Sequence, residues 1–176
     1  MYIRYCFPYS LDKKLGQAYN KEFETVGDDD WVCLKDADVA FLTPDYGSFI
    51  VDIINAYPHT GVFTCFTNRI GNRWQRYPGM FDEKDITVHH AKAKLVRETH
   101  GYSATILHKP ISGMVMIVSK KAWNQVKFKE EGILRVDNDF SKRILQKRIP
   151  IRRIDGLYVL HYYRFNEGAN STTHLK

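Results

Sequence analysis

Two aspartates one residue apart follow an apolar stretch of the chain, and their spacing suits metal chemistry. Asp36 and Asp38 come after residues 31–34, a run typical of a buried strand. Alternate residues of an extended segment point the same way, so both carboxylates can face one site. Such oxygen donors suit Mg²⁺ or Mn²⁺, whose coordination shell often also includes oxygens of substrate phosphates. A capping or turn role is the alternative, because two other aspartate pairs repeat the spacing: Asp28 with Asp30, and Asp137 with Asp139.

A basic loop is the second feature that could do chemistry. Arg69, Arg73 and Arg76 follow a strand-like segment in a stretch that also contains Gly71 and Trp74. One guanidinium group can bind two oxygens of a phosphate at once, and it can also stack on an aromatic ring. The loop could therefore clamp a diphosphate or stack on a base, and a plain solvated loop is the alternative interpretation.

The composition describes a folded protein of modest size. The 176 residues are 44% hydrophobic and 14% aromatic, enough to build the core of one domain. We expect that domain over residues 1–165 and a polar, flexible tail over residues 166–176. A net charge of +6 is compatible with nucleic-acid binding, but no nucleic-acid-binding motif is readable, so no such partner is expected.

Three features indicate a cytoplasmic protein. The sequence contains no apolar run long enough to span a membrane. Its first residues lack the basic start and apolar core of a secretion signal. The cysteines lie in apolar stretches without metal-ligand spacing, which favours reduced core thiols: Cys6, Cys33 and Cys65.

Strand-like and helical patterns alternate along the chain. Strands are predicted over residues 2–7, 31–34, 62–67, 103–107, 114–119, 149–154 and 158–163. Helices are predicted over residues 11–23, 46–56, 82–99 and 120–126, with a further helix ending near residue 147. This alternation favours an α/β fold with a mostly parallel sheet and helices on its faces. Ligands of such sheets bind beyond the carboxyl ends of the strands, where Asp36 and Asp38 lie.

Turn and capping residues predict several boundaries. Asp155 and Gly156 form a hairpin signal between the last two strands. Thr43, followed by Pro44, is expected to cap the helix over residues 46–56. Asp137 or Asn138 is expected to cap the last helix.

Four stretches of the chain form a recognisable series: a helix start at residues 14–20, the Asp-x-Asp strand at 30–38, a Gly-containing strand at 111–119 and an acidic helix start at 136–143. On these stretches the chain resembles glycosyltransferase family 2, whose members have the GT-A fold and use nucleotide-sugar donors. The order and spacing of the matching stretches agree over residues 14–164. One strand, rather than two strand–helix units, precedes the first matching helix, which implies a minimal, Rossmann-like version of the fold.

The resemblance implies a donor site with a metal ion. Asp38 would bind Mn²⁺ or Mg²⁺, and Asp36 would face the ribose and could share the metal. His161 would be a third ligand, although a hydrogen-bonded strand residue is the alternative. Further donor-site residues would bind the diphosphate or let the substrate approach the backbone: Arg69, Arg73, Arg164, Ser112 and Gly113.

The resemblance also implies a general base at the acidic helix start. Asp137 matches the family's acid and would take the proton of the acceptor hydroxyl in an inverting displacement. Asp139 competes for this role. Val136 stands where the family often has Glu.

The function implied is a metal-dependent, inverting glycosyltransferase of the hexosyl-transferring kind. It would move a sugar from a UDP- or GDP-sugar to a carbohydrate or glycan-lipid acceptor. One alternative is a nucleotidyltransferase that makes a nucleotide sugar, although residues 8–12 lack the Gly-rich basic loop that such enzymes carry. The other alternative is a non-catalytic nucleotide- or nucleic-acid-binding module with an eroded donor site.

Overall fold

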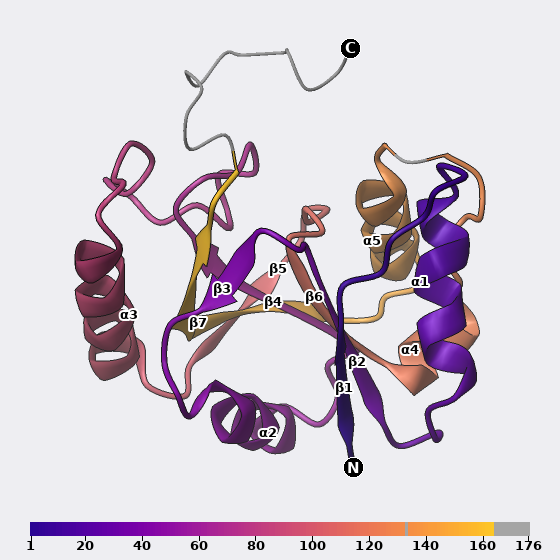
Figure 1. Cartoon of the computed structure of the whole chain (residues 1–176). Coiled ribbons are helices and arrows are strands. Elements are labelled where there is room, and N and C mark those ends of the chain that lie inside the picture. Colours follow the sequence, from indigo (N-terminus) through magenta and orange to yellow (C-terminus); the bar gives the residue numbers. More distant parts are fainter. Residues whose placement is uncertain (133, 164–176) are drawn as a thin grey trace.

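The structure is a computed structural model that describes residues 1–132 and 134–163, so the polar tail lies outside the described residues (Figure 1). The helices are α1 (Leu15–Glu24), α2 (Tyr46–Ala56), α3 (Ile86–His100), α4 (Lys120–Gln125) and α5 (Val136–Gln146). The strands are β1 (Ile3–Cys6), β2 (Trp31–Lys35), β3 (Val39–Phe41), β4 (Val62–Thr67), β5 (Ala104–Leu107), β6 (Val115–Ser119) and β7 (Ile151–His161).

All seven strands form one sheet, which confirms the α/β class. The order is β1-β2-β6-β4-β7-β3, and β5 pairs with the first part of β7. The expectation of a mostly parallel sheet was wrong, because only the β1–β2 and β4–β7 pairings are parallel among the six described. The reversed strand β6 lies between β2 and β4, and β3 and β5 run against β7.

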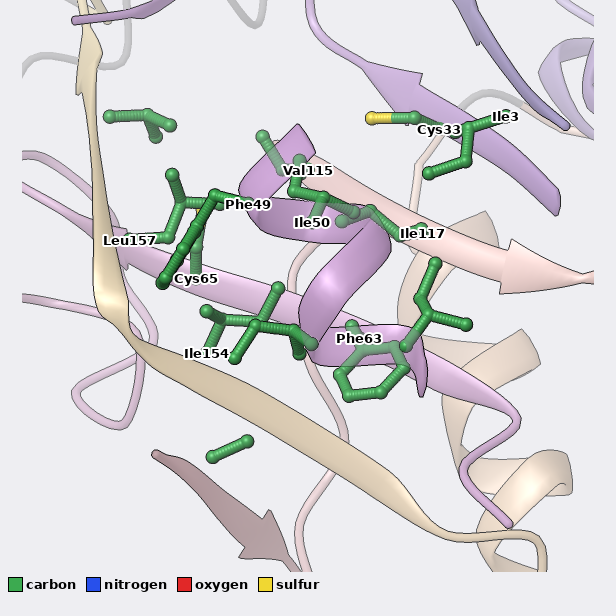
Figure 2. Packing of buried hydrophobic residues seen from close by; sticks show 14 of the residues in the cluster. Ile3, Cys33, Phe49, Ile50, Phe63, Cys65, Val115, Ile117, Ile154 and Leu157 are labelled. Carbon is green, nitrogen blue, oxygen red and sulfur yellow. The ribbon is translucent and has the colours of Figure 1, made fainter. Parts of the chain in front are cut away.

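Helices cover both faces of the sheet, which explains why its central strands read as continuous apolar runs. The buried side chains of α2, among them Phe49 and Ile50, pack on one face. Figure 2 shows them among residues of the three strands β4, β6 and β7, labelled Phe63, Cys65, Val115, Ile117, Ile154 and Leu157. Buried residues of α1, α4 and α5 pack on the other side with β2 and β6, and these helices lie together in Figure 1.

The predicted hairpin at Asp155 and Gly156 was wrong, because both residues lie inside the single long strand β7. Asp155 and Gly156 make packing contacts within the sheet and do not form a turn. The Asp155 carboxylate binds Arg153 and accepts a hydrogen bond from Thr105 at 2.7 Å. Gly156 lets the backbone of Gly101 approach closely, since a Cβ at this position would lie 2.0 Å from the Gly101 carbonyl oxygen.

We expect Gly156→Ala to lower the free energy of unfolding by about 1–3 kcal/mol, because the added methyl group would force backbone atoms apart. Urea unfolding followed by circular dichroism measures this change. Gly71→Ala is the matched control, since a Cβ at Gly71 meets nothing within 4 Å. Equal midpoints for the two variants would show that Gly156 is not required by packing.

The helix starts differ from the predicted caps. Asp45, rather than Thr43, occupies the N-cap of α2, and it makes no side-chain capping hydrogen bond. Arg135 occupies the N-cap of α5 in the left-handed conformation, with φ of 63°, so neither Asp137 nor Asn138 caps this helix. The helix α3 ends at His100, one residue from the predicted end, and Gly101 follows with φ of 50° and an N–H that binds the Arg97 carbonyl.

The cysteines are free thiols, as expected. Cys33 and Cys65 are fully buried, and Cys6 is partly buried at the edge of the sheet. Burial raises the pKa of Cys6 to about 12, so this thiol stays protonated at neutral pH. Within residues 1–132 and 134–163, no helix has the length and apolar character needed to cross a membrane.

Candidate functional site

One edge of the sheet gathers the predicted site residues. The parallel-running strands β2 and β7 end here, and the reversed strands β3 and β6 begin here. Asp36 follows β2 directly, Asp38 precedes β3, and His161 is the last residue of β7. The pairing of β3 with β7 puts Val39 opposite His161 and thereby brings Asp38 beside the imidazole.

Asp36, Asp38 and His161 form a compact set of three potential metal ligands. One donor atom from each lies within 4.8 Å of the other two. Nε2 of His161 is 3.4 Å from Oδ1 of Asp38 and 4.0 Å from Oδ2 of Asp36. The carboxylate side chains are 45% exposed and the His161 side chain is 7% exposed, so the set is open to solvent from the acidic side.

Hydrogen bonds to Asn68 and Arg69 fix the orientation of His161. Its Nδ1 lies 2.7 Å from the carbonyl oxygen of Arg69, and its backbone N–H donates to Oδ1 of Asn68 at 2.8 Å. A carbonyl oxygen only accepts, so Nδ1 carries a proton and Nε2 faces the carboxylates. Metal-binding histidines are commonly held in this way by a second-layer acceptor. A proton or a cation can therefore occupy the space between His161 and the two aspartates.

The turn between the two aspartates is held by backbone and side-chain bonds. Nζ of Lys35 donates to the carbonyls of Asp36 and Val39, at 3.3 and 2.9 Å. The N–H of Asp36 donates to the Met114 carbonyl at 3.0 Å, which joins the turn to the start of β6. These bonds keep both carboxylates on the same side of the turn.

The two aspartates have opposite electrostatic environments. Burial raises the pKa of Asp36 despite the nearby His161, and the negative charges of Asp38 and Asp137 add to this effect. A hydrogen bond from His161 lowers the pKa of Asp38. A divalent cation between these groups would compensate the repulsion of the carboxylates, and the two oxygens and one imidazole nitrogen fit Mn²⁺ and related ions.

Asp137 lies in the first turn of α5 and faces the segment that leads into β6. Its Oδ2 accepts a hydrogen bond from the N–H of Gly113 at 2.6 Å. A Cβ on Gly113 would come within 2.9 Å of the Cβ of Asp137, so the glycine permits this approach. Asp137 also contributes to the field at Asp36, which places it near the metal-ligand set.

Asp139 has a different environment from Asp137. Its carboxylate accepts from Lys129 at 2.9 Å and from Arg143 at 2.7 Å. Partial burial opposes ionisation, but these two hydrogen bonds lower the pKa of Asp139. Within the described residues, both oxygens of Asp139 are thus engaged by cations on the outer side of α5.

The segment of residues 111–114 connects Asp137 with the metal-ligand set. Gly113 binds Asp137, and Met114 binds the backbone of Asp36. The side-chain amide of Gln75 pairs with both backbone groups of Ser112, at 2.7 and 3.0 Å. Ser112 itself is partly buried.

The arginines of the basic loop divide into buried and exposed residues. Arg69 is 4% exposed, and its guanidinium group donates to the carbonyls of Phe81 and Tyr163. Arg73 is exposed and stacks over Trp74, 4.5 Å from the ring centroid. Arg76 is exposed beside Phe81. Arg164 lies outside the described residues.

Several residues that shape the site gave no signal in the sequence analysis: Lys35, Asn68, Gln75 and Met114. Asn68, Gln75 and Met114 form hydrogen bonds with the backbone of distant segments, and such bonds follow no sequence spacing. Lys35 binds the backbone carbonyls of the turn that follows it. Asn68 and Gln75 are fully buried polar residues in a stretch that was interpreted through its arginines. The alternation of polar and basic residues there was the one available hint.

Comparison of the chain with models of known protein families finds no match, and a search among curated proteins finds no significant match either.

Proposed function

We propose that the protein is a metal-dependent, inverting glycosyltransferase with a minimal GT-A-like fold. The observation that carries this proposal is the convergence of Asp36, Asp38 and His161 at the carboxyl ends of β2 and β7, with donor atoms within 4.8 Å. Ligands of α/β sheets bind at such strand ends. The Asp137 carboxylate, bound to the Gly113 N–H beside this set, adds the general base that such a group transfer requires.

The residues divide the chemical work between binding and proton transfer. Asp36, Asp38 and His161 would hold Mn²⁺ or Mg²⁺. When bound, such an ion supplies positive charge for the departing diphosphate. Asp137 would accept the proton of the acceptor hydroxyl. Its bond to the Gly113 N–H occupies one oxygen, Oδ2, and leaves the other for the substrate.

The sheet supports the GT-A assignment through its arrangement. The strand that delivers the Asp-x-Asp pair is adjacent to the reversed strand β6, and the segment before β6 carries Ser112 and Gly113. The single strand β1 that precedes α1 agrees with a shortened nucleotide-binding half. A nucleotide-sugar donor, with UDP or GDP as the nucleotide, and a carbohydrate or glycan-lipid acceptor are part of the proposal. The free cysteines fit an enzyme of the cytoplasm.

Titration with UDP- and GDP-sugars, with and without Mn²⁺, tests the proposal directly. A ligand that binds only the folded state stabilises it by RT ln(1 + [L]/Kd) and thereby raises the melting temperature. We expect one nucleotide class to stabilise the protein in the presence of Mn²⁺ and not in the presence of EDTA. Stabilisation by none of these donors at millimolar concentration would contradict the proposed function.

A further inference from the structure

The segment of residues 111–114 lies outside the strands, yet side chains from distant parts of the chain bind its backbone. Ser141 of α5 binds the N–H of Ile111 at 3.1 Å, and the Gly113 N–H is bound by Asp137. The two backbone groups of Ser112 are bound by Gln75 alone among the described residues. This segment is the covalent link between the Asp137 contact and the Asp36 contact.

Gln75 is suited to this task by its chemistry. A side-chain amide both donates and accepts, so it can bind the N–H and the carbonyl of one residue, as a neighbouring strand does. Oε1 accepts from the Ser112 N–H at 2.7 Å, and Nε2 donates to the Ser112 carbonyl at 3.0 Å. Neither a carboxylate nor an apolar side chain can make both bonds.

Gln75 is itself held firmly. The residue is fully buried, and its Nε2 also donates to Oγ1 of Thr64 at 2.7 Å. Its backbone carbonyl accepts from the N–H of Thr67, at the end of β4, at 2.8 Å. The backbone of Gln75 is thereby anchored at the end of β4 independently of the bond to Thr64.

We propose that Gln75 is a positioning residue for Asp137. Gln75 binds both the N–H and the carbonyl of Ser112, and the carbonyl shares a planar peptide unit with the Gly113 N–H. Gln75 thereby fixes the direction of the Gly113 N–H, which orients the Asp137 carboxylate beside the metal-ligand set. The inference rests on the proposed function only for the role of Asp137 as base. The geometric part of the inference stands without it.

Gln75→Met tests the geometry without any substrate. Methionine keeps the length and burial of the side chain and removes both bonds to Ser112. We expect the proton signal of the Gly113 amide in ¹H–¹⁵N NMR to move upfield relative to the unsubstituted protein, and the amide to exchange with D₂O about tenfold faster or more. An unchanged Gly113 amide would overturn the inference and would leave the proposed function untouched.

Thr64→Val is the matched control. Thr64 belongs to the same buried network, but it contacts the Gln75 amide and the Val115 carbonyl rather than Ser112. Thr64→Val removes one bond to Gln75 but keeps the backbone bond to Thr67 and both bonds to Ser112. We therefore expect its Gly113 amide to stay close to that of the unsubstituted protein. An equal change in Thr64→Val and Gln75→Met would indicate general loosening and would overturn the inference.

If Gln75→Met does not fold, Gln75→Glu replaces it, because a carboxylate keeps only the bond to the Ser112 N–H. An unaltered Gly113 amide in Gln75→Glu would then overturn the inference.

Turnover provides the second readout. With the UDP- or GDP-sugar that stabilises the protein, and with Mn²⁺, we expect Gln75→Met to lower kcat for donor hydrolysis or transfer by about tenfold and to leave KM for the donor unchanged. A rise in KM with unchanged kcat would contradict the positioning role. Absence of turnover in the unsubstituted protein would refute the proposed function, while the Gly113 amide would still decide the geometry.

Discussion

Asp38→Asn should abolish the metal-dependent binding of nucleotide while leaving the fold intact. Asp38 contributes one of two carboxylates to the ligand set and lies 3.4 Å from His161. Asparagine preserves size but removes the negative charge that a divalent cation requires. Outer-layer partners of metal ligands already change affinity by about 10–100-fold, so loss of a ligand should cost at least as much. Isothermal calorimetry with Mn²⁺ and UDP or GDP measures the effect.

The control for Asp38→Asn is Asp29→Asn. Asp29 is an exposed aspartate before β2, at the opposite end of the strand that leads to Asp36, and it pairs with Lys121 on the surface. Its replacement should leave Mn²⁺ binding unchanged. Circular dichroism should show the same helix and strand content in both variants. Full Mn²⁺-dependent binding by Asp38→Asn would remove Asp38 from the metal site.

The elements that position the site were largely predictable, because burial on both faces of a sheet leaves a clear apolar signal. Residues 31–34 are buried throughout, and the strand β2 ends close to where the apolar run ends. The position of Asp36 and Asp38 at a strand end followed from this pattern. The helix α2 begins and ends at the predicted residues because its apolar residues recur at helical spacing and pack on the sheet.

The pairing of the strands was not predictable in the same way. Nothing in residues 115–119 shows that β6 reverses direction and lies between β2 and β4. Sheet order depends on long-range packing rather than on local pattern. Asp155 and Gly156 illustrate the same limit, since the turn signal was overridden by the close contact between Gly156 and Gly101. Local preference is a weak guide where tertiary contacts decide the backbone path.

The candidate site was predictable in its charged groups and not in its supports. Asp36 and Asp38 could be identified because two carboxylates after an apolar strand are chemically distinctive, and His161 was expected as a third ligand through the family resemblance. Gln75 could not, since an amide that binds the backbone of residue 112 looks in the sequence like any loop glutamine. The same reason applies to Lys35, whose amine holds the turn between the two aspartates.

Asp137→Asn should leave the protein folded and able to bind donor, yet reduce turnover by about 10²-fold or more. A general base acts on the acceptor proton in the transition state, so its loss affects kcat rather than binding. Because Arg135 is the N-cap of α5, Asp137 has no capping role to lose. The asparagine oxygen can still accept from the Gly113 N–H, which preserves the contact made by Oδ2 at 2.6 Å. Melting temperature, calorimetry with donor, and initial rates measure the three quantities.

Asp139→Asn separates the base from its neighbour on the same helix turn. Asp139 binds Lys129 and Arg143, and partly exposed ion pairs of this kind contribute about 1 kcal/mol or less to stability. We therefore expect a small loss of stability and near-normal turnover in Asp139→Asn. If Asp139→Asn is inactive and Asp137→Asn is active, the base is Asp139. If both variants keep full turnover, the start of α5 is structural, and an inverting displacement assisted by this helix is wrong.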